Sequence, residues 1–218
     1  MRASLTIASA VTLLLLPTAA FASCTASLGA PAFSVAMMDP PVNYRFDLDS
    51  AALAKIAREN GMPRLKGEIP FGLTIGRYDL EVTIDTDTTV DGSGYCAQLH
   101  AAHVEIGLKQ LDVIVDRRFA AGSCERQAVL DHERQHVEVF REAARHYLPA
   151  LESILAQTLL PFDLHVADRE AARAAYLGPI TDSLKPVFVA INDRARNGNT
   201  GLDEPDSYAA VFKRCDHW

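Results

Sequence analysis

The sequence lacks the features that mark nucleic-acid binding, nucleotide binding and serine hydrolysis. It has no run of five or more basic residues, and its 21 Lys and Arg are outnumbered by 28 Asp and Glu. This charge balance argues against nucleic acid or heparin as a partner. No G-x-S-x-G, P-loop or dinucleotide fingerprint is present, and no internal repeats are visible. These absences leave an ordinary globular chain with a mildly acidic charge.

The first 22 residues have the pattern of a secretory signal peptide. Arg2 precedes a stretch rich in Ala, Leu, Val and Ile, and Ala20-Phe21-Ala22 has the small-x-small form of a cleavage site. Pro17 interrupts the apolar run and no basic flank follows, which argues against a transmembrane helix. We therefore expect residues 1–22 to be removed and residues 23–218 to form one domain, in the periplasm or outside the cell.

The cysteines indicate the cellular compartment of the protein and whether it is attached to a membrane. Cys24, Cys96, Cys124 and Cys215 remain after cleavage, and an even number in an exported chain predicts two disulfides. Three pairings are possible, of which we favour Cys96–Cys124 and Cys24–Cys215. In an alternative interpretation Cys24 is acylated as part of a lipoprotein box, and only then would the protein be attached to a membrane.

The chain divides into a β-rich part and a helical part. Alternation and β-branched residues predict the strands, a change of period to about 3.6 residues after Ser123 predicts the helices, and Ser123 is a plausible N-cap. The expected strands are Val42–Leu48, Tyr78–Val90, Leu99–Leu108 and Leu111–Phe119, and the expected helices are Ala51–Asn60, Cys124 to about Leu160, about Val166–Arg196 and Ser207–Lys213. This order predicts an α+β fold in which packed helices follow an antiparallel sheet. Pro149 either kinks its helix or starts a new one.

The motif H-E-x-x-H lies within the first long helix. Two histidines four residues apart, His132 and His136, share one helix face and can bind one Zn²⁺. Glu133 can then reach a water on the metal and act as the general base of a peptidase. The motif therefore predicts a zinc site with His132 and His136 as ligands and Glu133 as the catalytic residue.

The helical phase separates this hypothesis from a solvated helix face. At 100° per residue, Glu133 falls about 20° from the centre of the apolar stripe, His136 about 40° and His132 about 80°. The stripe consists of Val129, Val137, Phe140, Ala144, Leu148, Leu151 and Leu155. An unpaired carboxylate facing inward would cost several kcal/mol, so Glu133 needs a cation nearby. A zinc-bound water supplies one, and a buried Glu–Arg or Glu–His ion pair is the alternative.

The segment GSCERQAVLDHERQHVEVFREA resembles bacterial exported families of predicted zinc-dependent proteases that carry H-E-x-x-H on a helix. The resemblance covers about residues 100–150 and, more loosely, the C-terminal LDEPDSYAAVFKRC. It implies a zincin-like active-site helix, with His132 and His136 as ligands and Glu133 as base, and a peptide or protein substrate. In zincins generally the strands before this helix bind the peptide by β-augmentation.

A third zinc ligand does not follow from the motif. Glu142 stands where a metzincin would have its last histidine, but on an unbroken helix it lies on the far side from the site. Glu170, His165 and Asp163 could reach the site only if the chain turns back at Pro149. These three are candidates, and the third ligand stays open.

Two classes of function therefore follow from the sequence. One is an exported zinc metallopeptidase in which a metal-activated water hydrolyses peptide bonds. The other is a non-catalytic periplasmic domain that binds a metal or a partner. A fourth protein ligand in place of water would indicate the second class.

Overall fold

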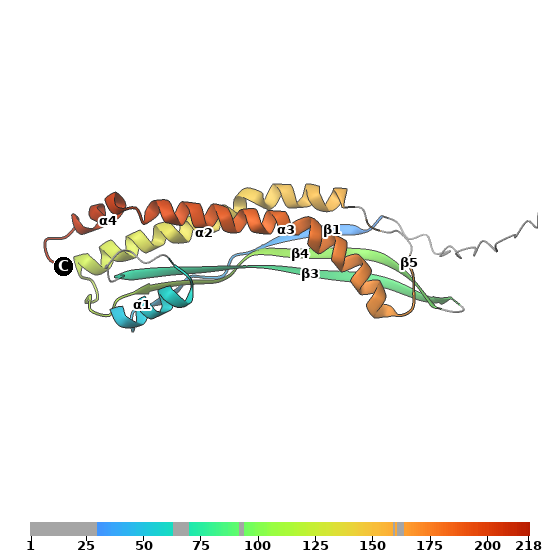
Figure 1. Ribbon diagram of the computed structural model, residues 1–218, viewed down its shortest axis with the longest axis horizontal. Helices are drawn as coiled ribbons and strands as arrows, with labels where there is room; N and C mark the ends of the chain where they lie inside the picture. The colour runs from blue at the N-terminus through green and yellow to red at the C-terminus, as the bar shows by residue number, and fades with distance from the viewer. Residues whose placement is uncertain (1–29, 63–69, 92–93, 159, 161–163) are drawn as a thin grey trace, which may run out of the picture.

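A computed structural model of the chain describes residues 30–62, 70–91, 94–158, 160 and 164–218. The predicted signal peptide and Cys24 lie outside the described residues. Figure 1 shows an elongated molecule in which long helices run along a long sheet. Among the described residues, no helix is both long and apolar enough to cross a bilayer.

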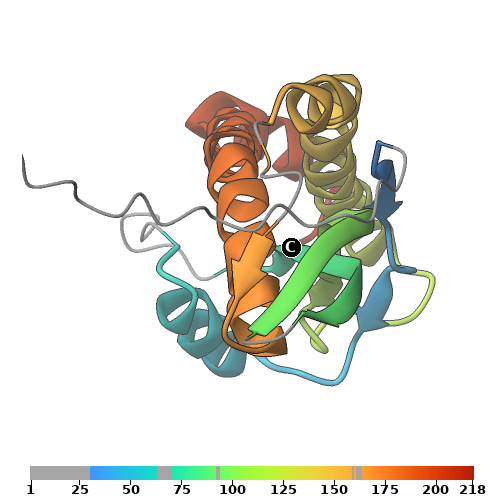
Figure 2. The same ribbon diagram turned by 90° about the vertical axis from the view of Figure 1, so that its right-hand side faces the viewer.

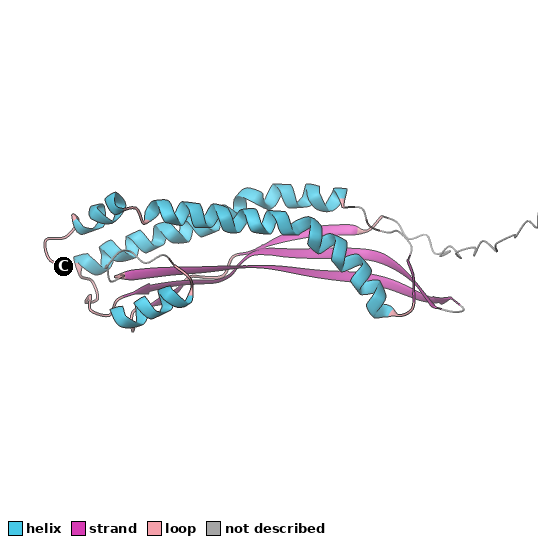
Figure 3. Cartoon of the chain, viewed as in Figure 1, coloured by secondary structure: helices cyan, strands magenta, loops and turns pink. Residues whose placement is uncertain are grey.

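The sheet is built on one long hairpin, which extends along most of the molecule (Figure 3). Strands β3 (Gly72–Asp91) and β4 (Gly94–Val115) pair antiparallel over nearly their whole length. The other edge of β4 carries three short strands in succession: β5 (Leu164–Val166), β1 (Ala32–Met38) and β2 (Asn43–Arg45). The predicted strands Leu99–Leu108 and Leu111–Phe119 are thus parts of one strand.

The prediction of an antiparallel sheet is wrong, because the sheet is mixed. β1 and β2 run parallel to β4, whereas β3 and β5 run antiparallel to it. β1 and β2 form almost one edge strand, broken at Pro40 and Pro41, which have no N–H to donate to β4. Helix α1 (Ser50–Glu59), capped by the Asp49 side chain, then turns the chain back into β3.

Two bulges keep the apolar side of β4 facing the helices. Register shifts leave His100 and Lys109 as extra residues opposite β3. Each bulge moves the alternation by one residue, and both bulged residues are exposed. The buried side chains of β4 that pack against the core below the long helices are Ala97, Leu99, Ala102, Val104, Ile106, Leu108, Leu111, Val113 and Val115.

The helical part follows the sequence prediction closely. Helix α2 (Cys124–Gln157) begins at Ser123, whose side chain accepts a hydrogen bond from the Arg126 N–H, and continues through Pro149. Helix α3 (Arg169–Leu202) runs back along α2, and α4 (Pro205–Phe212) follows it. Viewed from the end, α2 and α3 lie side by side (Figure 2). The coarse expectation of a sheet followed by packed helices is confirmed.

The disulfide pairing differs from the prediction. Cys124 is bonded to Cys215, with a Cα–Cα distance of 5.9 Å, so Cys96–Cys124 and Cys24–Cys215 are both wrong. Cys96 and Val115 lie near opposite ends of β4, about 60 Å apart at 3.3 Å per residue, and α2 starts near Val115. A disulfide requires Cα atoms within about 7 Å. The C-terminus, by contrast, lies beside the start of α2 (Figure 1). Cys96 is also disulfide-bonded.

Candidate metal centre

The three motif residues of α2 are buried, as the helical phase predicts. Glu133 is 3% exposed, His132 5% and His136 6%, whereas Arg134 and Gln135 are exposed. The side chains of α2 pack against alternate residues of β3, which are small at this end of the sheet. A Cβ atom on Gly72 would lie 2.5 Å from Glu133 Oε1. Because glycine has no side chain, the Glu133 carboxylate can pack against β3 at this position.

A hydrogen bond from β3 holds the Glu133 carboxylate in place. Thr74 Oγ1 donates to Glu133 Oε2 at 2.7 Å, and Thr74 is itself buried. Burial raises the pKa of Glu133, and the charges of His136 and His132 and the Thr74 hydrogen bond oppose this without cancelling it. Among the described residues, no arginine forms an ion pair with Glu133. The Glu–Arg alternative therefore has no support in this part of the chain.

A third group, Asp203, completes a triangle with the two histidines. The distances are 3.2 Å between His132 Nε2 and His136 Nε2, 3.1 Å from His136 Nε2 to Asp203 Oδ1, and 3.5 Å from His132 Nε2 to the same oxygen. Zinc–nitrogen and zinc–oxygen bonds of 2.0–2.2 Å at tetrahedral angles place neighbouring ligand atoms about 3.3 Å apart. The group His132, His136 and Asp203 could therefore hold a metal ion.

The hydrogen bond on the far side of the His136 ring favours a ligand role. His136 Nδ1 lies 2.9 Å from Asn199 Oδ1. A carbonyl oxygen can only accept, so Nδ1 carries a proton, and whenever the ring is neutral Nε2 presents its lone pair to the triangle. A hydrogen-bond acceptor behind the ring is the usual partner of a metal-binding histidine. Asn199 thus fixes both the tautomer and the orientation of His136.

The position of Asp203 also calls for a nearby cation. Asp203 is the C-cap of α3, at the negative end of the helix dipole, where a carboxylate is unfavourable. Burial would raise the pKa of Asp203, but hydrogen bonds from His132 and His136 outweigh it and lower the pKa to about 2. For His136, burial alone would lower the pKa. The hydrogen bond with Asp203 and the charges of Glu133 and Asp203 outweigh burial, so the pKa of His136 is raised overall. A cation, either a proton or a metal ion, is therefore favoured between these groups.

The candidates named from sequence for the third ligand lie elsewhere. Glu170 is in the first turn of α3, about 50 Å along that helix from Asp203 at 1.5 Å per residue. His165 pairs with Cys96 at the hairpin end of the sheet, and Glu142 is exposed on α2. Asp163 lies outside the described residues. These candidates required the chain to turn back at Pro149, and this condition is not met, because α2 continues through Pro149 to Gln157. The chain turns back after α2, and the end of α3, not its start, meets the motif.

The segment that carries Asp203 is tied to the start of α2. Arg214 donates to Asp131 at 2.8 Å, one residue before His132, and Cys215 is bonded to Cys124. Leu202-Asp203-Glu204-Pro205 opens the C-terminal stretch already singled out by the resemblance. That stretch was the one sequence signal that could have pointed to Asp203.

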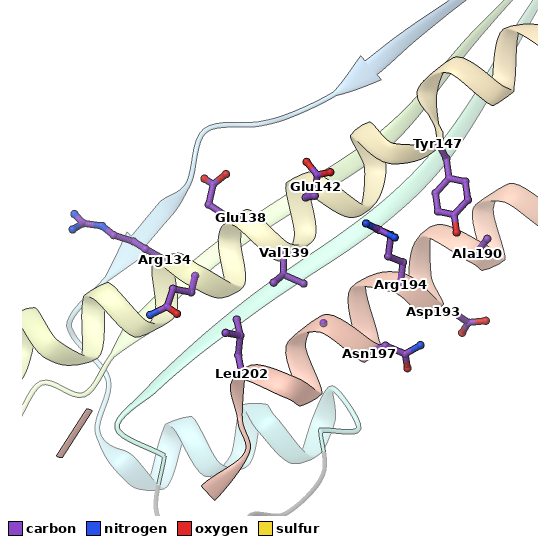
Figure 4. Close-up of a pocket in the computed structure, with 12 residues that line it drawn as sticks. Arg134, Glu138, Val139, Glu142, Tyr147, Ala190, Asp193, Arg194, Asn197 and Leu202 are labelled. Carbon is purple, nitrogen blue, oxygen red and sulfur yellow. The ribbon is translucent and has the colours of Figure 1, made fainter. Parts of the chain in front are cut away.

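Two hollows lie close to the triangle on the solvent side. The smaller, of about 240 Å³, is lined by His132 and by residues of α4. The larger, of about 1070 Å³, lies between α2 and α3 (Figure 4). Gln135 and Leu202 line both hollows, so the two adjoin beside the group of His132, His136 and Asp203.

Comparison of the chain with protein-family models, curated proteins and solved structures gives no match.

Proposed function

We propose that the protein is an exported zinc-dependent metallopeptidase. The observation that carries this proposal is the convergence of His132, His136 and Asp203 on one point, with the carboxylate of Glu133 buried beside it. The Cys124–Cys215 disulfide is consistent with an oxidising compartment, which supports the export predicted from residues 1–22.

The donor set supports zinc as the metal. Two imidazole nitrogens and one carboxylate oxygen suit Zn²⁺, whereas Mg²⁺ and Ca²⁺ prefer sites made of oxygen alone. Catalytic zinc sites have three protein ligands and one open position, and structural sites have four protein ligands. Among the described residues only three such groups converge, and this favours the catalytic class over the non-catalytic alternative.

A zinc ion held here would polarise a peptide carbonyl and make a coordinated water more acidic. Glu133 would accept a proton from the attacking water and then deliver it to the leaving amine. Thr74 fixes the direction of the Glu133 carboxylate through its hydrogen bond. Asn199 would hold the His136 ring in its binding orientation.

Metal content and peptide cleavage together test this proposal. We expect one zinc ion per purified wild-type chain, measured by elemental analysis, and cleavage of a mixed peptide substrate. His136→Ala should lose the zinc, whereas Glu133→Gln should keep it and lose 10²- to 10⁴-fold in kcat. The matched control is Glu152→Gln, an exposed glutamate of the same helix that lines neither hollow, which should match the wild type in both measurements.

The outcomes separate the hypotheses. A wild-type chain that folds and binds no zinc contradicts the metal site. A chain that binds zinc and cleaves no peptide supports the structural alternative. Cleavage that survives Glu133→Gln unchanged rejects the assigned base.

A further inference from the structure

The hollow between α2 and α3 is an open groove with an apolar floor and one charged group inside it. Val139 and Leu202 point toward the facing helix, and the Arg194 side chain projects into the space between the helices (Figure 4). Glu138 and Glu142 point to the other side of α2 in the same view. At the floor, Gly198 allows close contact, because a Cβ there would lie 2.7 Å from Val139 Cγ1.

Arg194 differs from the other charged residues that line the groove. Each of the others has an ion-pair partner on its own helix: Arg134–Asp131, Glu138–Arg141, Glu142–Arg145 and Asp193–Arg196. Within the described ranges of the chain, Arg194 forms no ion pair. Its guanidinium is therefore free to bind a carboxylate of another molecule, with two parallel hydrogen bonds where the geometry allows.

The groove leads to the metal-binding residues. It shares Gln135 and Leu202 with the hollow that His132 lines, and Leu202 directly precedes Asp203. From Arg194 to Asp203 is about 13 Å along α3, at 1.5 Å per residue. An extended peptide covers this distance in about four residues, at 3.3 Å per residue. A polypeptide with its scissile bond at the metal would thus place a side chain four residues away near Arg194.

We propose that the α2–α3 groove binds an extended polypeptide and that Arg194 selects substrates with an acidic side chain about four residues from the cleaved bond. This inference rests on the proposed peptidase function and makes it more specific. The amide side chains of Gln135 and Asn197, which line the groove, can both donate to and accept from a peptide backbone. Because the groove continues well beyond the metal-binding residues, the substrate extends at least four residues to one side of the cleaved bond.

Peptides with blocked ends test the charge preference. One set carries Glu, Gln or Lys four residues before the cleaved bond, and a second set carries them four residues after it. Only one of the two sets places the varied residue near Arg194. In that set the kcat/KM of the wild type should be about fivefold higher for the Glu peptide than for the Gln peptide, as expected for a partly exposed ion pair. Arg194→Gln should remove this preference, and Arg194→Glu should favour the Lys peptide.

The matched control is Arg173→Glu, which reverses the charge of an exposed arginine on the same helix outside the groove. It should keep the wild-type preference for glutamate, and all variants should bind zinc as the wild type does. A preference that persists in both Arg194 variants, or that is absent from the wild type, overturns the inference while the peptidase stands. If no peptide is cleaved by any zinc-loaded protein, the proposed function itself fails.

Discussion

At the scale of single residues, the site is defined by groups that orient one another. Thr74 holds Glu133 from the sheet, and Asn199 holds His136 from α3. Both supporting residues lie far in sequence from the residue they hold. The geometry of the three motif side chains therefore depends on β3 and α3, although all three residues lie on one helix.

Asn199→Ala should weaken zinc binding 10- to 100-fold, because His136 loses the acceptor that fixes its tautomer. The measurement is competition with a chromogenic chelator at neutral pH. Asn197→Ala, two residues earlier and exposed, is the control and should leave the zinc affinity unchanged. Equal affinities in both variants and the wild type would show that Asn199 does not support the metal.

At the scale of elements, the site is a junction between the start of α2, the end of α3 and the start of β3. The Cys124–Cys215 disulfide links residues 91 positions apart and holds the C-terminal segment beside α2. On the opposite face of the sheet, Leu53 of α1 packs against Leu73, Ile75 and Ile114. The elements that carry the site are thus fixed from both sides of the sheet.

Replacing the disulfide in Cys124→Ser/Cys215→Ser should lower the free energy of unfolding by about 2–5 kcal/mol, because the unfolded chain regains the entropy of a long loop. Zinc affinity should fall as well, since Asp203 loses part of its support. Urea denaturation and chelator competition measure the two effects. The double substitution avoids leaving one unpaired thiol. Unchanged zinc affinity would mean that packing alone positions Asp203.

Asp116 links α1 to the end of β4 and makes the free energy of unfolding depend on pH in the acid range. Burial would raise its pKa, but hydrogen bonds from Arg118 and Ser50 outweigh this and lower the pKa below the ordinary value. Because the folded-state pKa is the lower one, the ionised carboxylate stabilises the fold at neutral pH. This stabilisation decreases as the pH falls below the unfolded-state pKa, about 3.9, and through the folded-state value.

Asp116→Asn should therefore lower the free energy of unfolding at pH 7 by about 1–3 kcal/mol. The difference from the wild type should shrink as the pH falls below about 4. Urea denaturation of both proteins across this range measures it. Asp112→Asn, at a half-buried aspartate near the end of β4, is the comparison. A difference that stays constant down to acid pH would contradict a role for the carboxylate charge.

At the scale of the whole molecule, a metal ion would link the two long helices at one end of the helical layer. His132 and His136 lie near the start of α2, and Asp203 lies at the end of α3. The two helices also pack together through a core of buried side chains that includes Leu151, Leu155, Tyr176, Ile180 and Leu184. Because the ligands come from separate elements, the unfolded chain does not present them together, and metal binding should stabilise the native state.

Zinc at 100 times its dissociation constant should raise the free energy of unfolding by about 2.7 kcal/mol. Chemical denaturation with zinc and with a chelator gives this difference directly. The His136→Ala variant, treated in the same way, should gain much less. Equal stabilisation of the wild type and His136→Ala would show that zinc binds at another site.

Much of the local structure could be predicted from the sequence. The start of α2 at its N-cap Ser123 and the burial of His132, Glu133 and His136 depend on hydrogen bonds and periodicity within one helix, and these predictions are confirmed. Strand β1 was missed because its sequence, Ala32–Met38, has no regular alternation and contains Ala and Met, which are not strong strand formers. The two bulges of β4 were missed because only pairing with β3 makes them visible.

The sequence by itself determined which residues on one helix face the core and can bind a metal, because the phase of a helix follows from local backbone hydrogen bonds. Only the tertiary structure decided that Asp203 is the third group, that Cys124 pairs with Cys215 and that β1 and β2 lie parallel to β4. Each of these depends on how elements far apart in the chain pack together. Packing of α3 against α2 buries a shared apolar core, and the position of Asp203 beside the histidines is a consequence of that packing.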